Sequence, residues 1–159
     1  MKKIIINSKK RGIKEVLVDD EDFDFLNKYK WSLAGHDQYY YAVGWVNSRS
    51  IRMHRLIMKE DNKSVLIDHK DHNGLNNQKI NLRRATYSQN GMNRRVKSTS
   101  LSQYLGLGWC KRRKRWIASI TQNGKPTFLG WFKDEKEAAI EYDKAAKAMF
   151  GEFANLNFK

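Results

Sequence analysis

The feature that most constrains the fold of this chain is an Asn-Gly pair, Asn123-Gly124, between two short runs of strand-like residues. Asn-Gly is typical of the two-residue turn of a β-hairpin, because both residues tolerate a positive φ angle. The flanking runs cover 115–122 and 127–132, and a third run precedes them at 104–111. Three strand-like runs separated by turn residues predict a three-stranded antiparallel sheet in the C-terminal third of the chain.

A helix is expected directly after this sheet. Asp134 is a favoured N-cap residue, and Glu137 stands three residues later, as in a capping box. Gly151 is a favoured helix-ending residue. Between them, small and apolar residues recur at helical spacing, namely Ala138, Ala139, Tyr142, Ala145, Ala146 and Met149. The alanines let a helix lie close to a sheet, so we predict one helix backing the three strands.

The positive charge of the chain is concentrated in one block. The chain has 31 Lys and Arg against 17 Asp and Glu, a net charge of +14, and 13 of these cations lie in residues 72–133, which contain no acid. Such a block repels itself unless a polyanion neutralises it, so nucleic acid is the expected partner; the alternative is a solvated basic face. The candidate contacts are Arg83, Arg84, Arg94, Arg95, Lys111, Arg113, Arg115 and Lys125, with Trp109 either stacking on the nucleic acid or packing in the core.

Several classes of protein are excluded by composition. The single cysteine, Cys110, allows neither an internal disulfide nor a CxxC zinc clamp, so no structural zinc is expected. No apolar run approaches the roughly 18 to 20 residues of a membrane span. The N-terminal apolar stretch is too short for a signal peptide. We therefore expect a cytoplasmic protein without membrane contact.

The N-terminal part, residues 1–63, has a mixed α/β pattern. Strands are expected at 3–6 and 15–18, and again at 39–46 and 50–53 around a turn. Acids at 19–22 are expected to open a short helix, and a second short helix is expected at 54–59. Residues 96–103 are basic and rich in Ser and Thr, which is the composition of a linker.

The residues between these segments, 64–95, carry the candidate chemistry. Asp68 and His69 end an apolar strand, and Asn90 falls on a helix expected from about Thr86. A carboxylate and an amide oxygen suit a hard cation such as Mg²⁺. A neutral histidine beside them suits a general base acting on water near pH 7. Neighbouring strand residues point to opposite faces, so a local bend is needed for both to serve one site.

This segment resembles the HNH nuclease motif, the ββα-metal finger. Asp68-His69 follows an apolar strand, Asn81-Leu82-Arg83 comes twelve residues after the histidine, and Asn90 comes nine after that. Because Asn90 stands where many members have a second histidine, the pattern is similar to the H-N-N variant of phage and intron-encoded homing endonucleases. The resemblance implies that His69 is the general base and that Asn81 braces its loop. It also implies that Asp68 and Asn90 hold one divalent metal, Mg²⁺ or Mn²⁺.

Residues 104–159 resemble the ethylene-response-factor (plant apetala-type) DNA-binding domain. The matching stretches are 104–107, 116–120, 128–132, 137–146 and 151–158. Members of that family lay the sheet in the major groove, as a β-ribbon does. Leu105, Gly108 and Thr121 stand where plant members have base-reading arginines, so the plant target sequence does not transfer.

Together the two resemblances imply an α+β chain in which a ββα-metal HNH module is followed by a three-stranded sheet packed on one helix. The implied function is a metal-dependent, homing-type endonuclease that nicks duplex DNA at a site chosen partly by residues 104–159. It would act as a monomer or weak dimer in a bacterial host cell. The alternative function is a non-catalytic DNA-binding regulator with a degenerate HNH fold. An RNA-binding protein is a third class, in which the sheet would stack single-stranded bases.

Overall fold

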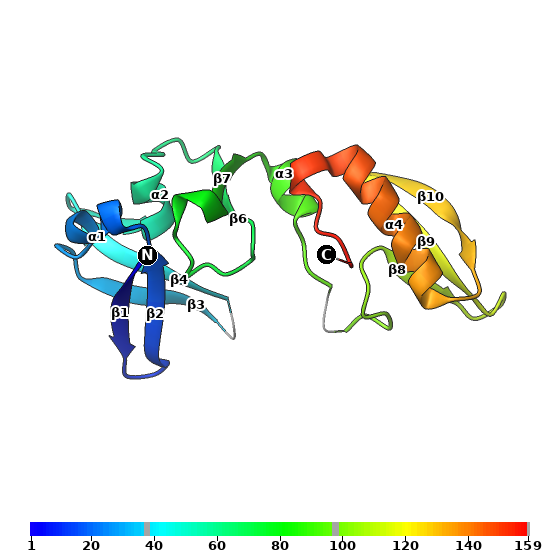
Figure 1. Ribbon diagram of the computed structural model, residues 1–159, viewed down its shortest axis with the longest axis horizontal. Coiled ribbons are helices and arrows are strands. Elements are labelled where there is room, and N and C mark those ends of the chain that lie inside the picture. Colours follow the sequence, from blue (N-terminus) through cyan, green and yellow to red (C-terminus); the bar gives the residue numbers. More distant parts are fainter. Residues whose placement is uncertain (37–38, 97–98, 159) are drawn as a thin grey trace. The chain divides into compact units, whose positions relative to one another are not determined.

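The structure is a computed structural model that describes residues 1–36, 39–96 and 99–158. It divides into two units, Met1–Thr86 and Tyr87–Lys159 (Figure 1). Residues 97–98 of the predicted linker lie outside the described residues. The predicted boundaries at 63, 95 and 103 remain predictions.

The first unit opens with a two-stranded antiparallel ribbon. Strands β1 (Lys2–Ser8) and β2 (Gly12–Val18) lie where two strands are predicted, and they pair with each other. Side chains alternate between faces, so that Ile4 and Ile6 are buried while Ile5 between them is exposed. Helix α1 (Asp20–Leu26) follows at once. Asp19 occupies its N-cap position, but its carboxylate bonds to the loop residues Gln78 and Lys79 instead of capping the helix.

A three-stranded antiparallel sheet follows in the order β3-β4-β5. Its strands are β3 (Trp31–His36), β4 (Tyr39–Val46) and β5 (Arg49–Arg52). Asn47 and Ser48 form the predicted turn between β4 and β5, both with positive φ. Helix α2 (Met53–Ile57) begins directly after β5. Strand β3 is not predicted from the sequence, and its pairing with β4 defines it.

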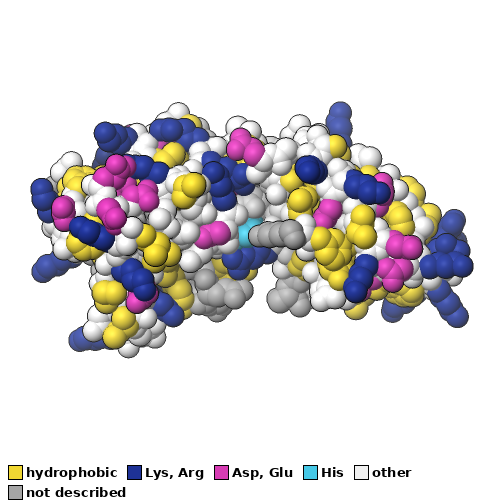
Figure 2. Space-filling view, in the orientation of Figure 1, with side chains coloured by type: hydrophobic (Ala, Val, Ile, Leu, Met, Phe, Trp, Pro, Cys, Tyr) yellow, Lys and Arg dark blue, Asp and Glu magenta, His cyan; other side chains and the backbone are white. Residues whose placement is uncertain are grey.

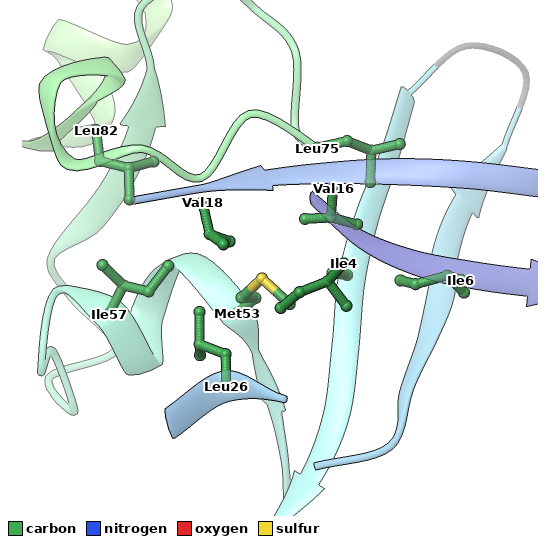
Figure 3. Packing of buried hydrophobic residues seen from close by; sticks show 10 residues of the cluster. Ile4, Ile6, Val16, Val18, Leu26, Met53, Ile57, Leu75 and Leu82 are labelled. Atoms are coloured by element: carbon green, nitrogen blue, oxygen red, sulfur yellow. The ribbon is translucent and has the colours of Figure 1, made fainter. Parts of the chain in front are cut away.

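The core of this unit draws on both strands of the first ribbon, on helices α1 and α2 and on strand β4 (Figure 3). Val16, Val18, Leu26 and Met53 are completely buried at its centre. Leu75 joins them from a loop that is fastened to β2, because the Leu17 amide donates to the Leu75 carbonyl at 2.8 Å and the Asn77 amide to the Leu17 carbonyl at 2.8 Å. The core thus anchors the 70–77 loop that follows β6.

The last elements of the first unit form a second ribbon. Strand β6 (Leu66–His69) pairs antiparallel with β7 (Leu82–Ala85), and the short 3-10 helix η1 (Lys79–Asn81) leads into β7. Helix α3 (Tyr87–Met92) then begins the second unit. The chain therefore has strand, strand and helix in this order, and their assembly into a ββα-metal finger stays a prediction.

The second unit has the predicted sheet and helix. Strands β8 (Leu107–Cys110), β9 (Arg115–Gln122) and β10 (Lys125–Phe132) form an antiparallel sheet in the order β10-β9-β8. Helix α4 (Glu135–Phe150) packs on it, and the short η2 (Gly151–Phe153) follows. Asn123 and Gly124 both have positive φ in the β9–β10 turn. The Asp134 carboxylate accepts from the amides of Lys136 (2.8 Å) and Glu137 (3.0 Å), which confirms the predicted N-cap.

The contact between α4 and the sheet is close because its residues are small. Ala138, Ala139 and Ala146 of the helix are completely buried, Ala118 and Ile120 of β9 are buried as well, and α4 contacts β9. The mixed α and β content with small antiparallel sheets confirms the coarse fold class. Across the parts of the chain that the structure describes, no helix is both long and apolar enough to cross a bilayer.

Candidate active site

Strand β6 delivers Asp68 and His69 at its end, and both side chains are buried. The chain turns directly afterwards, where the His72 amide donates to the His69 carbonyl at 3.0 Å. Across the ribbon, Asp68 faces Arg83, whose Nε and Nη2 donate to Oδ2 of Asp68 at 2.9 and 2.7 Å. The predicted metal-binding carboxylate and one predicted DNA contact therefore form a buried ion pair with each other. Removing one partner of such a pair costs about 3–5 kcal/mol, because it leaves the other charge buried and alone.

The ring of His69 is held by Asn77, a residue that the sequence interpretation did not assign to the site. Nε2 of His69 lies 3.4 Å from Oδ1 of Asn77, and the Asn77 side chain is completely buried. When Nε2 carries the proton it donates to this oxygen, and the lone pair is then on Nδ1. Burial lowers the pKa of His69 below its ordinary 6.5, against the opposing effects of Asn77, Asp71 and Asp68. The imidazole is therefore neutral at pH 7.

Asn81 holds together the loop that follows His69. Its Nδ2 donates to Oδ1 of Asp71 (2.9 Å) and to the Asn76 carbonyl (2.8 Å), while its Oδ1 accepts from the Asp71 amide (3.1 Å). Burial raises the pKa of Asp71, but hydrogen bonds from Asn73, Asn76 and Asn81 outweigh it, and the net pKa is lowered. Asp71 is an exposed residue, and its ionised carboxylate accepts hydrogen bonds from three asparagines of this loop.

Two further aromatic groups surround His69. His54 of α2 lies edge to face with it at a ring distance of 4.9 Å, and Tyr41 of β4 lies 5.7 Å from His54 and 5.8 Å from His69. Gly74 brings the loop close to β4, since a Cβ there would lie 2.7 Å from the Tyr41 ring. The sequence places His54 on a short helix among apolar residues, which signals burial but not proximity to His69.

His54 gives the first unit a pH-dependent stability. Burial, followed by the charge that His69 carries when it is protonated and by the charges of Arg52 and Arg55, lowers the pKa of His54 from 6.5 to about 3. The unfolded chain binds a proton at this residue below pH 6.5 and the folded chain does not, so stability falls as the pH drops through 6.5. From pH 7 to pH 5 we expect a loss of about 2 kcal/mol through His54.

This loss is measurable by urea unfolding of the first unit, followed by NMR through the amide signals of Val16 and Leu26. In the wild type, the free energy of unfolding should differ between pH 7 and pH 5. His54→Gln is expected to reduce this difference by about 2 kcal/mol. His36→Gln, at an exposed residue of β3, is the control and should leave the difference unchanged. An undiminished difference in His54→Gln would contradict the prediction.

Asn90, the second predicted metal ligand, lies exposed on α3 in the second unit. Within residues 1–36, 39–96 and 99–158, no group of three or more His, Cys, Asp and Glu is arranged to hold a metal ion. The predicted donor set contains one carboxylate and one amide oxygen, so it does not require such a group. Hard oxygen donors of this kind fit Mg²⁺ or Mn²⁺, which complete their coordination with water.

The other predicted DNA contacts fall on both units. Arg84 pairs with Glu60 at 2.9 Å and is thereby engaged within the first unit. Arg94 and Arg95 are exposed between α3 and β8, and Lys125 is exposed at the start of β10. Trp109 is 38% exposed and lies 5.0 Å from Trp116, so it both packs and remains accessible.

The basic run forms the turn between β8 and β9. Lys111 lies exposed in this turn, Arg113 stacks over the ring of Trp131 at 4.8 Å, and Arg115 begins β9. Figure 2 shows Lys and Arg side chains grouped at the right-hand end of the second unit. The sheet face opposite α4 carries Ile117, Ser119 and Thr121, which alternate with the buried residues of β9. A cleft of about 470 Å³ lies over this face, and Arg94 and Arg95 also line it.

Comparison with known proteins extends these observations. No family model and no solved structure matches the chain. The chain is 34% identical over 142 residues to the "Uncharacterized HNH endonuclease L560" of Acanthamoeba polyphaga mimivirus, covering 86% of this chain and 71% of that protein. It is 38% identical over 95 residues to "Protein 3.8" of Escherichia phage T7, covering 59% of this chain and 77% of that protein.

Plant DNA-binding proteins match a shorter stretch. Dehydration-responsive element-binding protein 2A of Arabidopsis thaliana is 48% identical over 46 residues, which is 28% of this chain and 14% of that protein. Other AP2-like plant proteins match over similarly limited lengths. The similarity to L560 extends over most of both chains, and on this ground the chain belongs to the HNH endonuclease family.

Proposed function

We propose that this protein is a metal-dependent, homing-type endonuclease that nicks one strand of duplex DNA, and that its second unit takes part in choosing the site. The observation that carries the proposal is His69, a buried neutral imidazole backed by Asn77 and adjacent to Asp68. A base of this kind accepts a proton from water near neutral pH. Membership of the HNH endonuclease family supports the same reaction.

Each residue of the site has a distinct part in phosphodiester hydrolysis. In the tautomer that donates Nε2–H to Oδ1 of Asn77, His69 takes the proton of the attacking water on Nδ1. Asn81 keeps the loop after His69 in place through its bonds to Asp71 and Asn76. Asp68 and Asn90 would hold one divalent cation, which supplies positive charge for the leaving 3′ oxygen when bound.

The second unit is proposed to bind duplex DNA through its sheet and the β8–β9 turn. We assign phosphate contacts to Lys111 and Arg113 of the turn and to Arg115 at the start of β9; such contacts position a protein without reading bases. Residues on the face opposite α4, such as Ser119 and Thr121, are then available to base edges. The match to a plant element-binding protein supports this part of the proposal.

Removing the positive charges of the β8–β9 turn tests whether the turn contacts phosphates while the sheet face contacts bases. Lys111→Gln, Arg113→Gln and Arg115→Gln together are expected to weaken binding to all DNA sequences. Each lost phosphate contact should reduce the slope of log K against log salt by about 0.9. The measurement is a salt titration of binding by fluorescence anisotropy.

The matched control removes the same charge from the outer side of α4, with Lys136→Gln, Lys144→Gln and Lys147→Gln. It should alter the salt slope far less, because these residues lie on the helix and not in the turn. A change of sequence preference in the turn variant, with an unchanged slope, would mean that the turn reads bases.

The test of the function is conversion of a supercoiled plasmid. The plasmid should carry the DNA that flanks the gene, and the reaction is run with Mg²⁺, with Mn²⁺ and with a chelator. The proposal expects open-circle product with the metals and none with the chelator. Bound but uncut DNA under every condition would instead identify a DNA-binding regulator.

A further inference from the structure

Arg52 lies on the sheet face that meets the candidate active site. In the register of β4 and β5, Arg52 is opposite Val43, and Tyr41 lies two residues along β4 on the same face. The Cζ atom of Arg52 is 4.9 Å from the centre of the Tyr41 ring. The other neighbours of that ring are His54 and His69, at 5.7 and 5.8 Å. One aromatic ring thus contacts both the guanidinium and the candidate base.

Arg52 differs from the neighbouring arginines, which have carboxylate or carbonyl partners within the protein. Arg49 on the same strand pairs with Asp61 at 2.7 Å, and Arg83 pairs with Asp68. Arg55 donates to the carbonyls of Val65 and Asn62. No carboxylate of the described residues forms an ion pair with Arg52, which is exposed and contacts the Tyr41 ring.

The position of this cation has an electrostatic cost. After burial and the charge of protonated His69, the charge of Arg52 is among the causes that lower the pKa of His54. An unpaired cation beside two buried histidines gains stability when an anion arrives. A guanidinium is suited to this anion, because its planar donors match the oxygens of a phosphate and its face stacks on an aromatic ring.

We propose that Arg52 is a phosphate-binding residue of the active site, which contacts a non-bridging oxygen of the phosphate attacked beside His69. Tyr41 holds the guanidinium plane, so the donors are oriented before DNA arrives. The positive charge stabilises the negative charge that grows on the phosphate during attack. This inference rests on the proposed nuclease function and adds a substrate contact to it.

The first test compares three variants by single-turnover nicking and by DNA binding in a mobility-shift assay. Arg52→Gln is expected to lower the nicking rate by about 10²-fold, the usual effect of losing one donor to a developing oxyanion, with binding changed far less. Arg52→Lys should restore part of the rate, because it keeps the charge and loses the planar fork. Arg49→Gln is the matched control on the same strand and should nick like the wild type.

Two results would overturn the proposal. Nicking by Arg52→Gln at the wild-type rate would show that Arg52 only stacks on Tyr41. An equal loss of binding and nicking would make it a general DNA contact. Circular dichroism of each variant checks folding, which should be unaffected because Arg52 is exposed on the edge strand β5.

A second measurement does not depend on cleavage. The Nε–Hε signal of Arg52 is followed by NMR during titration with inorganic phosphate, with the signal of Arg49 as the internal control. A saturable shift at Arg52 alone supports the phosphate contact, and no shift at Arg52 overturns it. If the wild type nicks no DNA in any metal, the nuclease proposal has failed, and this titration still decides whether Arg52 binds phosphate.

Discussion

Replacing His69 with alanine is expected to lower the nicking rate by about 10²–10⁴-fold, the range for loss of a general base. The side chain is buried and its Nε2 is engaged by Asn77, so it contributes little to holding DNA. DNA affinity should therefore remain near that of the wild type. The nicking rate is measured by open-circle formation from supercoiled plasmid, and the DNA affinity by a mobility-shift assay.

The matched control is His72→Asn, three residues further along the same loop. His72 has a φ of 62°, which asparagine tolerates better than alanine. This variant should retain most of the activity, because no step of the proposed hydrolysis is assigned to His72. If His69→Ala loses binding and nicking in equal measure, His69 is not the base. If both variants lose nicking equally, the assignment to His69 alone is wrong.

Replacing Gly106 with alanine is expected to destabilise the second unit by about 3–5 kcal/mol, the sum of a left-handed backbone cost and overpacking. Gly106 has a φ of +76°, and an added Cβ would lie 1.9 Å from Cδ2 of Tyr142 and 2.8 Å from the Ser119 carbonyl. Tyr142 is itself buried at the centre of this core and cannot move away freely. The Gly106 carbonyl also accepts from the Ser119 amide at 2.9 Å, which ties the backbone to β9.

Gly124→Ala separates the two causes. Gly124 has nearly the same φ, +77°, but nothing lies within 4 Å of an added Cβ. Gly124→Ala should lower the free energy of unfolding only by the cost of a left-handed backbone conformation, about 1–2 kcal/mol. Urea unfolding of the second unit, followed by NMR through the amides of Ala118 and Ile120, measures both variants. Equal losses at the two glycines would show that the contact with Tyr142 is relieved at little cost.

The second unit could be predicted in detail because its signals are local. Asn123-Gly124 sets the hairpin, Asp134 caps α4, and small residues recur on one face of the helix. Each of these signals acts within a few residues, so no knowledge of distant contacts is needed. Strands β3 and β7 could not be predicted from their own residues for the opposite reason. Their sequences contain Gly and Ala or two arginines, and they are strands because β4 and β6 pair with them.

In the candidate site, too, some features follow from the local sequence and others from contacts between distant residues. The sequence by itself predicts Asp68, His69, Asn81 and Asn90 as site residues, because their spacing along one short segment carries the motif. Only the tertiary structure decided that Asn77 contacts the His69 ring, that Arg83 neutralises Asp68, and that His54 and Tyr41 lie beside His69. These residues come from β4, α2, β7 and a loop fastened to β2, and nothing in their local sequence links them. Packing of the shared core brings them together, because each element must bury its own apolar face against the others.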